Sequence, residues 1–182
     1  MGDGSRDARL KRREGRREKE NSMDTNPLRD AYRALLDAAA AVADSGAVSP
    51  QAGEWNADQI LAHVALVNAA TITAVSSVAS GAVATYDNRL AQDTWTLERV
   101  IALAGGNAGL RDRIRVQADA LCALAGPVLS EAELDTPVPT LLLSDGALLV
   151  DQTVPLRGLI AGLADVELPG HAKQLQALLD HP

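Results

Sequence analysis

The 182-residue sequence contains no phenylalanine, and its aromatic residues are limited to two tryptophans and two tyrosines. A hydrophobic core must therefore be built from leucine, valine, isoleucine and alanine, and hydrophobic residues make up 47% of the chain. This composition favours closely packed helices. A chain of this length is expected to form one domain, and it is long enough to bury a substantial core.

Cysteine occurs once, as Cys122, which excludes an internal disulfide. The thiol lies in a predicted helix with no histidine near it in the sequence, so we interpret it as a packed core residue. No uninterrupted apolar run reaches the roughly 20 residues that a membrane span needs, and the N-terminus lacks the apolar core of a secretory signal. The sequence therefore predicts a soluble, cytoplasmic protein without a membrane partner.

Basic residues are scarce beyond the first 22 positions. Residues 1–22 contain eight Lys/Arg and five Asp/Glu, whereas residues 23–182 contain nine Lys/Arg and nineteen Asp/Glu. An acidic body repels phosphate backbones, which argues against nucleic-acid binding by the folded part. We interpret residues 1–22 as a disordered basic tail. Our hypothesis is that this tail is read from a start codon upstream of a native start at Met23, so that residues 23–182 are the folded domain.

Apolar residues recur at three- and four-residue steps along the first two predicted helices. The first helix is predicted to start at Thr25-Asn26-Pro27, with a capping side chain before a proline, and to end at Gly46. The second is predicted to start at Asn56, where Gln59 completes a capping box, and to continue to about Ser80.

Two further helices are predicted in the second half of the chain. The third runs from about Thr94 to Leu124, with its apolar face including Trp95 and Leu103, and Gly105-Gly106 predicts a bend or break in it. The fourth starts near Thr153 and is expected to kink at residues 165–169, because the proline there lacks a backbone donor.

The helical period disappears at residues 127–154. Apolar segments at residues 138–143 and 147–150 flank Ser144-Asp145-Gly146, which is a strong hairpin signal. A lone hairpin is marginally stable in water, so we expect this one to lie against the helices. Residues 81–92 are predicted as a loop. The patterns together predict an all-α fold with a small β-hairpin inserted before the last helix.

The histidines suggest one site. His181 is next to the last residue, where fraying and solvent disfavour a ligand role. Glu167 precedes His171 by four residues, so both side chains lie on one helix face, about one turn apart. With His63 of the second helix they would form a two-histidine, one-carboxylate metal set with positions open for water or substrate. The same spacing fits an alternative in which Glu167 is a surface acid, His171 a partly exposed residue and His63 a hydrogen-bonded core histidine.

Polar neighbours of such a pocket are expected from Asn68 on the second helix and Arg157 on the fourth, with ordinary solvation as the alternative for each. The sequence has no Gly-rich phosphate loop, no paired-cysteine metal motif and no Ser-His-Asp arrangement supported by a local motif. These absences argue against nucleotide-dependent and serine-hydrolase functions.

Two runs resemble the DinB-like family. Residues 55–65 (WNADQILAHVA) resemble its signature of a tryptophan, a cap and a helix with a metal-binding histidine. Residues 167–175 (ELPGHAKQL) resemble its last helix, which carries two ligands four residues apart and a following Gln-Leu. Glutamate as the first of these ligands is similar to the mycothiol-dependent maleylpyruvate isomerase branch, whose metal set is His, Glu and His.

The resemblance implies an up-down-down-up four-helix bundle in which His63, Glu167 and His171 hold one divalent metal ion, zinc or nickel. It also implies a homodimer. For some members it implies a small-molecule substrate and a low-molecular-weight thiol of the mycothiol or bacillithiol type, used in transfer or isomerisation. The hairpin insertion, and the lack of room for the isomerase's additional C-terminal domain, speak against the isomerase substrate. The alternatives are a non-catalytic small-ligand-binding or stress-response protein, and a dimeric scaffold without a metal.

Overall fold

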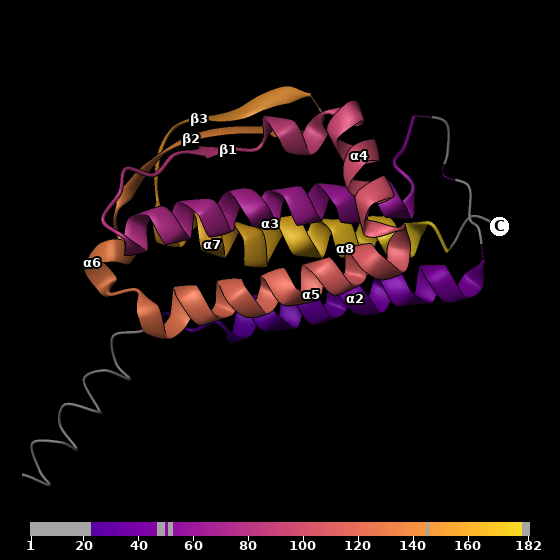
Figure 1. The fold of residues 1–182 in the computed structure, drawn as a ribbon, viewed down its shortest axis with the longest axis horizontal. Helices are drawn as coiled ribbons and strands as arrows, with labels where there is room; N and C mark the ends of the chain where they lie inside the picture. Colours follow the sequence, from indigo (N-terminus) through magenta and orange to yellow (C-terminus); the bar gives the residue numbers. More distant parts are fainter. Residues whose placement is uncertain (1–22, 47–49, 51–52, 145, 180–182) are drawn as a thin grey trace, which may run out of the picture.

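The computed structural model describes residues 23–46, 50, 53–144 and 146–179. The predicted basic tail, Asp145 and His181 lie outside these residues. The described part of the chain is mostly helical, and a small mixed sheet covers one side of the helices (Figure 1). The prediction of a mainly helical fold with a hairpin before the last helical segment is confirmed.

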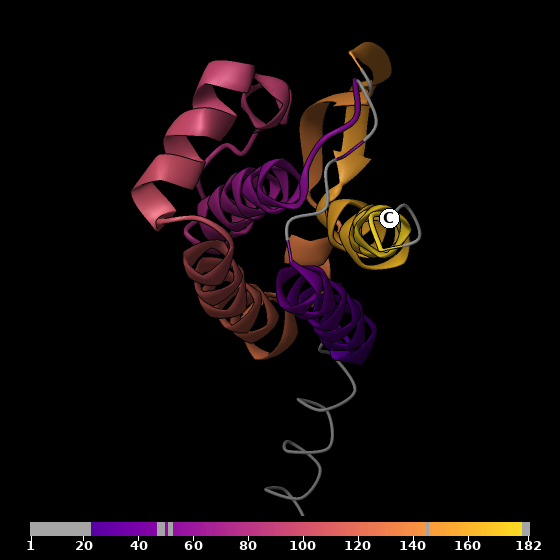
Figure 2. The ribbon, with the colours of Figure 1, turned by 90° about the vertical axis from the view of Figure 1, so that its right-hand side faces the viewer.

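Long helical segments lie side by side along the molecule, as the end-on view in Figure 2 shows. They are α2 (Asn26–Ser45), α3 (Ala57–Ala79), α5 (Asn107–Ala123), and a C-terminal segment of α7 (Leu156–Gly162), η3 (Leu163–Glu167) and α8 (Leu168–Ala177). Helix α3 packs mainly on α5, and α2 packs mainly on α8. The largest fully buried side chains are aliphatic, as the composition predicts: Leu28, Leu35, Ile60, Leu61, Leu97, Leu110, Ile114, Leu121, Leu134, Leu156, Ile160 and Leu168.

The start of α3 follows the predicted capping box. The Asn56 side chain accepts a hydrogen bond from the Gln59 backbone N–H at 2.9 Å, and the Gln59 side chain accepts one from the Asn56 N–H at 3.0 Å. The box fixes where the helix begins, and thereby the face on which His63 lies two turns later. At the start of α2, Thr25 makes no side-chain cap bond, so that prediction is wrong, and Asp24 accepts from the Asn26 N–H instead.

By length and composition alone, α3 could cross a membrane. It contains polar residues, so it is not an uninterrupted apolar run. In the structure 61% of its apolar window is buried against the rest of the chain. Most of this window therefore packs against the rest of the chain, as expected of a core helix.

The third predicted helix is two helices, α4 (Thr94–Ala104) and α5, with a complete break between them. Gly105 and Gly106 have φ values of +78° and +85°, which residues with a side chain rarely adopt. After the break α5 buries the face that the period predicts. In α4 that prediction is wrong, because Trp95 is 67% and Leu103 66% exposed.

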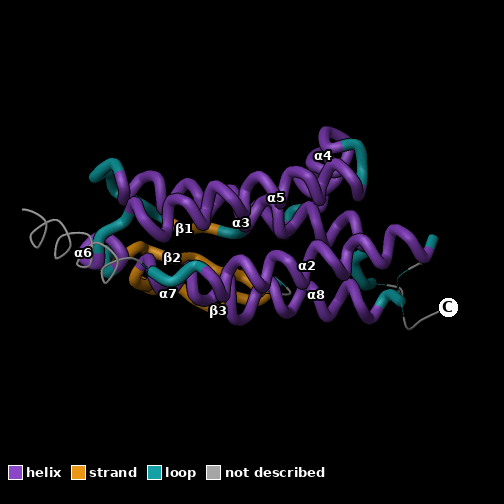
Figure 3. Tube along the Cα trace, turned by 90° about the horizontal axis from the view of Figure 1, so that it is seen from below, coloured by secondary structure: helices purple, strands orange, loops and turns teal. Residues whose placement is uncertain are grey.

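The predicted hairpin consists of β2 (Pro137–Ser144) and β3 (Ala147–Pro155), paired antiparallel with a register shift between Leu142 and Leu143. A third strand, β1 (Tyr86–Asp87), lies within residues 81–92, which are predicted as a loop. It pairs parallel with β2. Short helical turns also form at η1 (Arg89–Gln92), η2 (Leu124–Val128) and α6 (Glu131–Leu134). Figure 3, seen from below, shows the sheet behind the helices, on the side away from α2 and α5.

The last helical segment starts at Leu156 rather than Thr153, because β3 continues to Pro155. A kink is predicted at residues 165–169; the structure has a π-helical turn, η3, from Leu163 to Glu167, which overlaps this range. Pro169 then lies in the first turn of α8, where its missing N–H costs little. Such π-helical turns occur frequently at functional sites, and this one ends on the predicted ligand Glu167.

Candidate metal centre

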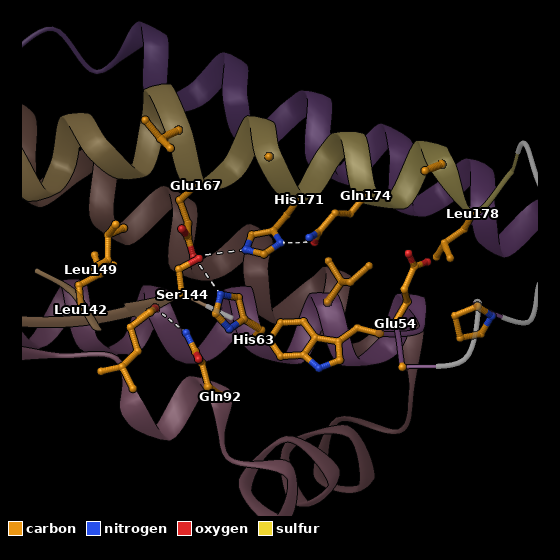
Figure 4. Close-up of a pocket in the computed structure, with 18 residues that line it drawn as sticks. Glu54, His63, Gln92, Leu142, Ser144, Leu149, Glu167, His171, Gln174 and Leu178 are labelled. Atoms are coloured by element: carbon orange, nitrogen blue, oxygen red, sulfur yellow. Dashed lines mark hydrogen bonds and ion pairs between the residues drawn. The ribbon is translucent and has the colours of Figure 1, made fainter. Parts of the chain in front are cut away.

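Three side chains from α3 and the C-terminal segment meet at one point (Figure 4). His63 projects from α3, Glu167 ends the π-helical turn, and His171 lies one turn further on in α8. One ligand atom from each lies within 4.8 Å of the other two. The predicted convergence of these side chains is therefore present, and the group could hold a metal ion.

Oxygen Oε1 of Glu167 is the atom that the two imidazoles share. It lies 2.9 Å from His63 Nε2 and 3.3 Å from His171 Nε2. Bonds from nitrogen or carboxylate ligands to zinc are about 2.0–2.2 Å long, so two ligand atoms on one ion stand about 3.0 Å apart at a right angle and about 3.4 Å apart at the tetrahedral angle. Both separations are thus close to those of neighbouring ligands on a single ion.

The other nitrogen of each ring faces an acceptor. His63 Nδ1 lies 2.8 Å from the Ala91 carbonyl oxygen, and His171 Nδ1 lies 2.7 Å from Gln174 Oε1. An N–H at each Nδ1 satisfies these contacts and leaves a lone pair on Nε2, which then points at the Glu167 carboxylate. Two acceptors facing one another repel unless a proton or a cation lies between them. Histidines that bind metals almost always donate their second N–H in this way.

The centre is largely shielded from solvent, with side-chain exposures of 4% for His63, 12% for His171 and 30% for Glu167. Burial raises the pKa of Glu167, but when the imidazoles of His171 and His63 are protonated, their hydrogen bonds and positive charge outweigh burial and bring this pKa well below its usual value. Glu167 is therefore a carboxylate at neutral pH, the form in which it binds a cation.

The three side chains line a cavity of about 560 Å³. The hairpin leucines Leu142 and Leu149 lie at one end of it, and Glu54 and Leu178 lie at the other (Figure 4). The Trp55 ring centroid is 5.0 Å from that of His63. The remaining lining residues are Pro50, Gly53, Ile60, Gln92, Leu143, Ser144, Val166, Gly170, Gln174 and Ala177.

Two amide side chains that the sequence analysis missed attach the hairpin to the rest of the molecule. Asn88 donates to the Leu143 carbonyl at 2.9 Å and accepts from the Leu143 N–H at 2.8 Å. Gln92 donates to the same carbonyl and accepts from the Gly146 N–H at 3.2 Å. Both amides lie in a segment without periodicity or motif, so no sequence signal could have found them. They position the hairpin end of the cavity.

The prediction that Asn68 and Arg157 are polar neighbours of the pocket is wrong. Asn68 is fully buried in the core, where it accepts from the Tyr32 hydroxyl at 2.6 Å and donates to Gln117 at 3.3 Å. Arg157 pairs with Glu131 at 2.7 Å and with Asp135 at 2.6 Å, which ties α7 to α6. Neither residue lines the cavity.

Two other expectations can be judged from burial. Cys122 is a buried core thiol, as predicted. The alternative interpretation of these residues fits His63, which is buried and hydrogen-bonded, and His171, which is partly exposed. Glu167 is 30% exposed, and it also lies within hydrogen-bonding distance of both imidazoles.

Comparisons of the chain with the profiles of protein families, with curated proteins and with solved structures found no match. The resemblance to the DinB-like family therefore depends on the two sequence runs around the ligands. The case for a metal centre depends on the distances and hydrogen bonds of His63, Glu167 and His171.

Proposed function

We propose that this chain is a metal-binding protein of the DinB-like kind, in which His63, Glu167 and His171 hold one divalent ion, zinc or nickel. One observation carries the proposal. Three possible metal-ligand atoms meet at the wall of a cavity, while the Nδ1 nitrogens of His63 and His171 each face a hydrogen-bond acceptor. Two imidazoles and a carboxylate suit zinc and nickel, and three protein ligands leave positions open on the ion.

The proposal includes the fold and setting that the resemblance implies. Helices α2, α3, α5 and the segment α7–α8 would form an up-down-down-up four-helix bundle, and the protein would be a cytoplasmic homodimer. The packing of α3 on α5 and of α2 on α8 and α5 supports this arrangement.

We further propose a transferase or isomerase that uses a low-molecular-weight thiol and a small-molecule substrate. A bound ion of this type lowers the pKa of a coordinated water or thiol. Glu167 supplies the one negative charge of the ligand set, while the Ala91 carbonyl and Gln174 hold the imidazoles in place. Trp55 and the hairpin leucines contribute apolar surface to the cavity beside the site.

The test uses the full chain purified without an affinity tag, stripped with a chelator and reloaded with zinc or nickel. We expect about one ion per chain by elemental analysis, the stoichiometry that a single mononuclear site requires. Glu167→Gln, which keeps the side-chain shape, and His171→Ala should each weaken binding by at least about 100-fold, because a direct ligand matters at least as much as its outer partners. His181→Ala, at the third histidine, is the matched control and should bind like the wild type.

Four results would contradict parts of the proposal. A metal content near zero after reloading would favour the scaffold without a metal. Unchanged binding by Glu167→Gln and His171→Ala would remove these residues from the site. Tight metal binding without thiol-dependent turnover would favour the non-catalytic ligand-binding or stress-response protein. Turnover that survives His63→Ala would remove the catalytic role proposed for the metal set.

A further inference from the structure

We propose that the cavity binds a small molecule with one metal-binding group, an apolar body and no second negative charge. This inference depends on the proposed ion at His63, Glu167 and His171, and it names the class of ligand that the site accepts. It follows from the charge of the cavity wall, from the polar groups that are already engaged, and from the apolar side chains at the hairpin end.

The cavity wall offers no protein cation to an anionic ligand. Among the described residues that line it there is no lysine or arginine, and the one ionisable side chain beyond the ligand set is Glu54. A divalent ion with Glu167 leaves one net positive charge, which a single anionic group neutralises. A second carboxylate would find no cation and would be repelled by Glu54.

Two polar side chains of the wall are already engaged with the protein. Gln92 uses its amide on the hairpin backbone, and Gln174 uses its oxygen on His171. A ligand that bonded to these two groups would have to replace hydrogen bonds that the protein already makes. The site therefore favours a ligand whose polar atoms are concentrated at the ion.

The hairpin end of the cavity presents apolar surface that the fold itself leaves open. Leu149 is 67% and Val166 71% exposed, and both line the cavity together with Leu142. In Figure 4 the two leucines lie on the hairpin side of Glu167, next to the ligand set. An apolar ligand body placed there would bury this surface while its head group reaches the ion.

The test compares acetate, hexanoate and hexanedioate on the cobalt-loaded full chain at neutral pH. Binding is followed by the visible spectrum of the cobalt and by calorimetry. We expect hexanoate to bind at least about tenfold more tightly than acetate, because each methylene that becomes buried strengthens binding by up to roughly fourfold. Hexanedioate, which has the same chain length, should bind at least about tenfold more weakly than hexanoate, because its second carboxylate finds no cation.

Two neighbouring leucines provide a matched pair of variants. Leu149→Ala should reduce the preference for hexanoate over acetate several-fold and leave cobalt affinity unchanged. Leu148→Ala removes a side chain of the same size that is 60% exposed on the same strand but does not line the cavity, and it should keep the preference. Glu54→Lys should strengthen hexanedioate binding relative to hexanoate.

The outcomes separate the two proposals. If cobalt itself does not bind, the proposed function and this inference are both overturned. If cobalt binds at the three ligands but hexanedioate binds as tightly as hexanoate, the inference alone is overturned. The same holds if Leu149→Ala and Leu148→Ala behave alike.

Discussion

The two sides of the cavity are built in different ways. The helical side is α3, which begins with a capping box and buries Ile60, Leu61 and His63 against other helices. The hairpin side is β2–β3, whose leucines Leu148 and Leu149 are 60% and 67% exposed. The helical side is thus part of the core, whereas the hairpin joins the core through Val138 of β2 and leaves most of β3 exposed.

The contrast indicates that the helices position the metal-ligand atoms and that the hairpin determines which small molecules bind. Donor atoms must be held to within a fraction of an ångström, which helices with packed side chains achieve better than loops. The hairpin contributes mainly contact surface, and its attachment includes the Asn88 and Gln92 hydrogen bonds and the short pairing with β1. Segments with few buried apolar contacts open locally at low free-energy cost. Changes on the helical side should therefore affect global stability, and changes on the hairpin side should affect ligand binding.

The largest effect is expected from Leu61→Ala on the helical side. Leu61 is fully buried, so its truncation leaves a cavity in the core and should lower the free energy of unfolding by about 2–5 kcal/mol. Leu149→Ala on the hairpin side should change it by less than about 0.5 kcal/mol, because that side chain is mostly exposed. Urea denaturation followed by circular dichroism measures both. Equal losses would show that the hairpin is part of the cooperative core.

Asn88→Ala should show that the hairpin is held by a few side-chain hydrogen bonds. Losing both bonds to Leu143 should destabilise the local structure by about 1–3 kcal/mol, because buried polar groups lose their partners. Hydrogen exchange should become faster in residues 137–155, with metal affinity unchanged. Gln152→Ala, at an exposed side chain of β3, is the control and should leave exchange unaltered. Faster exchange throughout the chain would contradict the comparison.

The sequence predicted the helical side well because its signals are local. The Asn56 and Gln59 pair, the period of α3 and the four-residue spacing of Glu167 and His171 each involve residues within a few turns. Local rules of capping and periodicity therefore apply directly. The contact of His63 with Glu167 and His171 joins residues that are far apart in the sequence. The position of His63 beside the apolar face of its helix made this contact plausible, and the family resemblance supported it.

The hairpin side was predicted only in outline, because its contacts are long-range. Strand β1 has two residues, and Asn88 reaches Leu143 from 55 positions away. No local pattern encodes such a pairing. The exposed face of α4 was missed for a related reason: Gly105 and Gly106 change the direction of the chain, so the period of α4 no longer determines which side is buried.

The cap of α3 allows a smaller test on the helical side. Asn56→Ala removes the side-chain half of the capping box and should lower the free energy of unfolding by about 0.5–2 kcal/mol. Thr25→Ala, at the corresponding position of α2, should have little effect because Thr25 makes no cap bond. Thermal denaturation of the two variants measures the difference. A larger loss for Thr25→Ala would contradict the assignment of these caps.

The smallest effect is expected from Arg157→Gln, which removes an ion pair on the surface. Arg157 is partly exposed and pairs with Glu131 and Asp135. Exposed ion pairs of this type contribute little to stability, so the loss should be smaller than for the other variants and should shrink further at high salt. Metal and hexanoate affinities should stay at wild-type values, because Arg157 does not line the cavity. Weaker hexanoate binding by Arg157→Gln would place a cation within reach of the ligand and contradict the charge argument for the cavity wall.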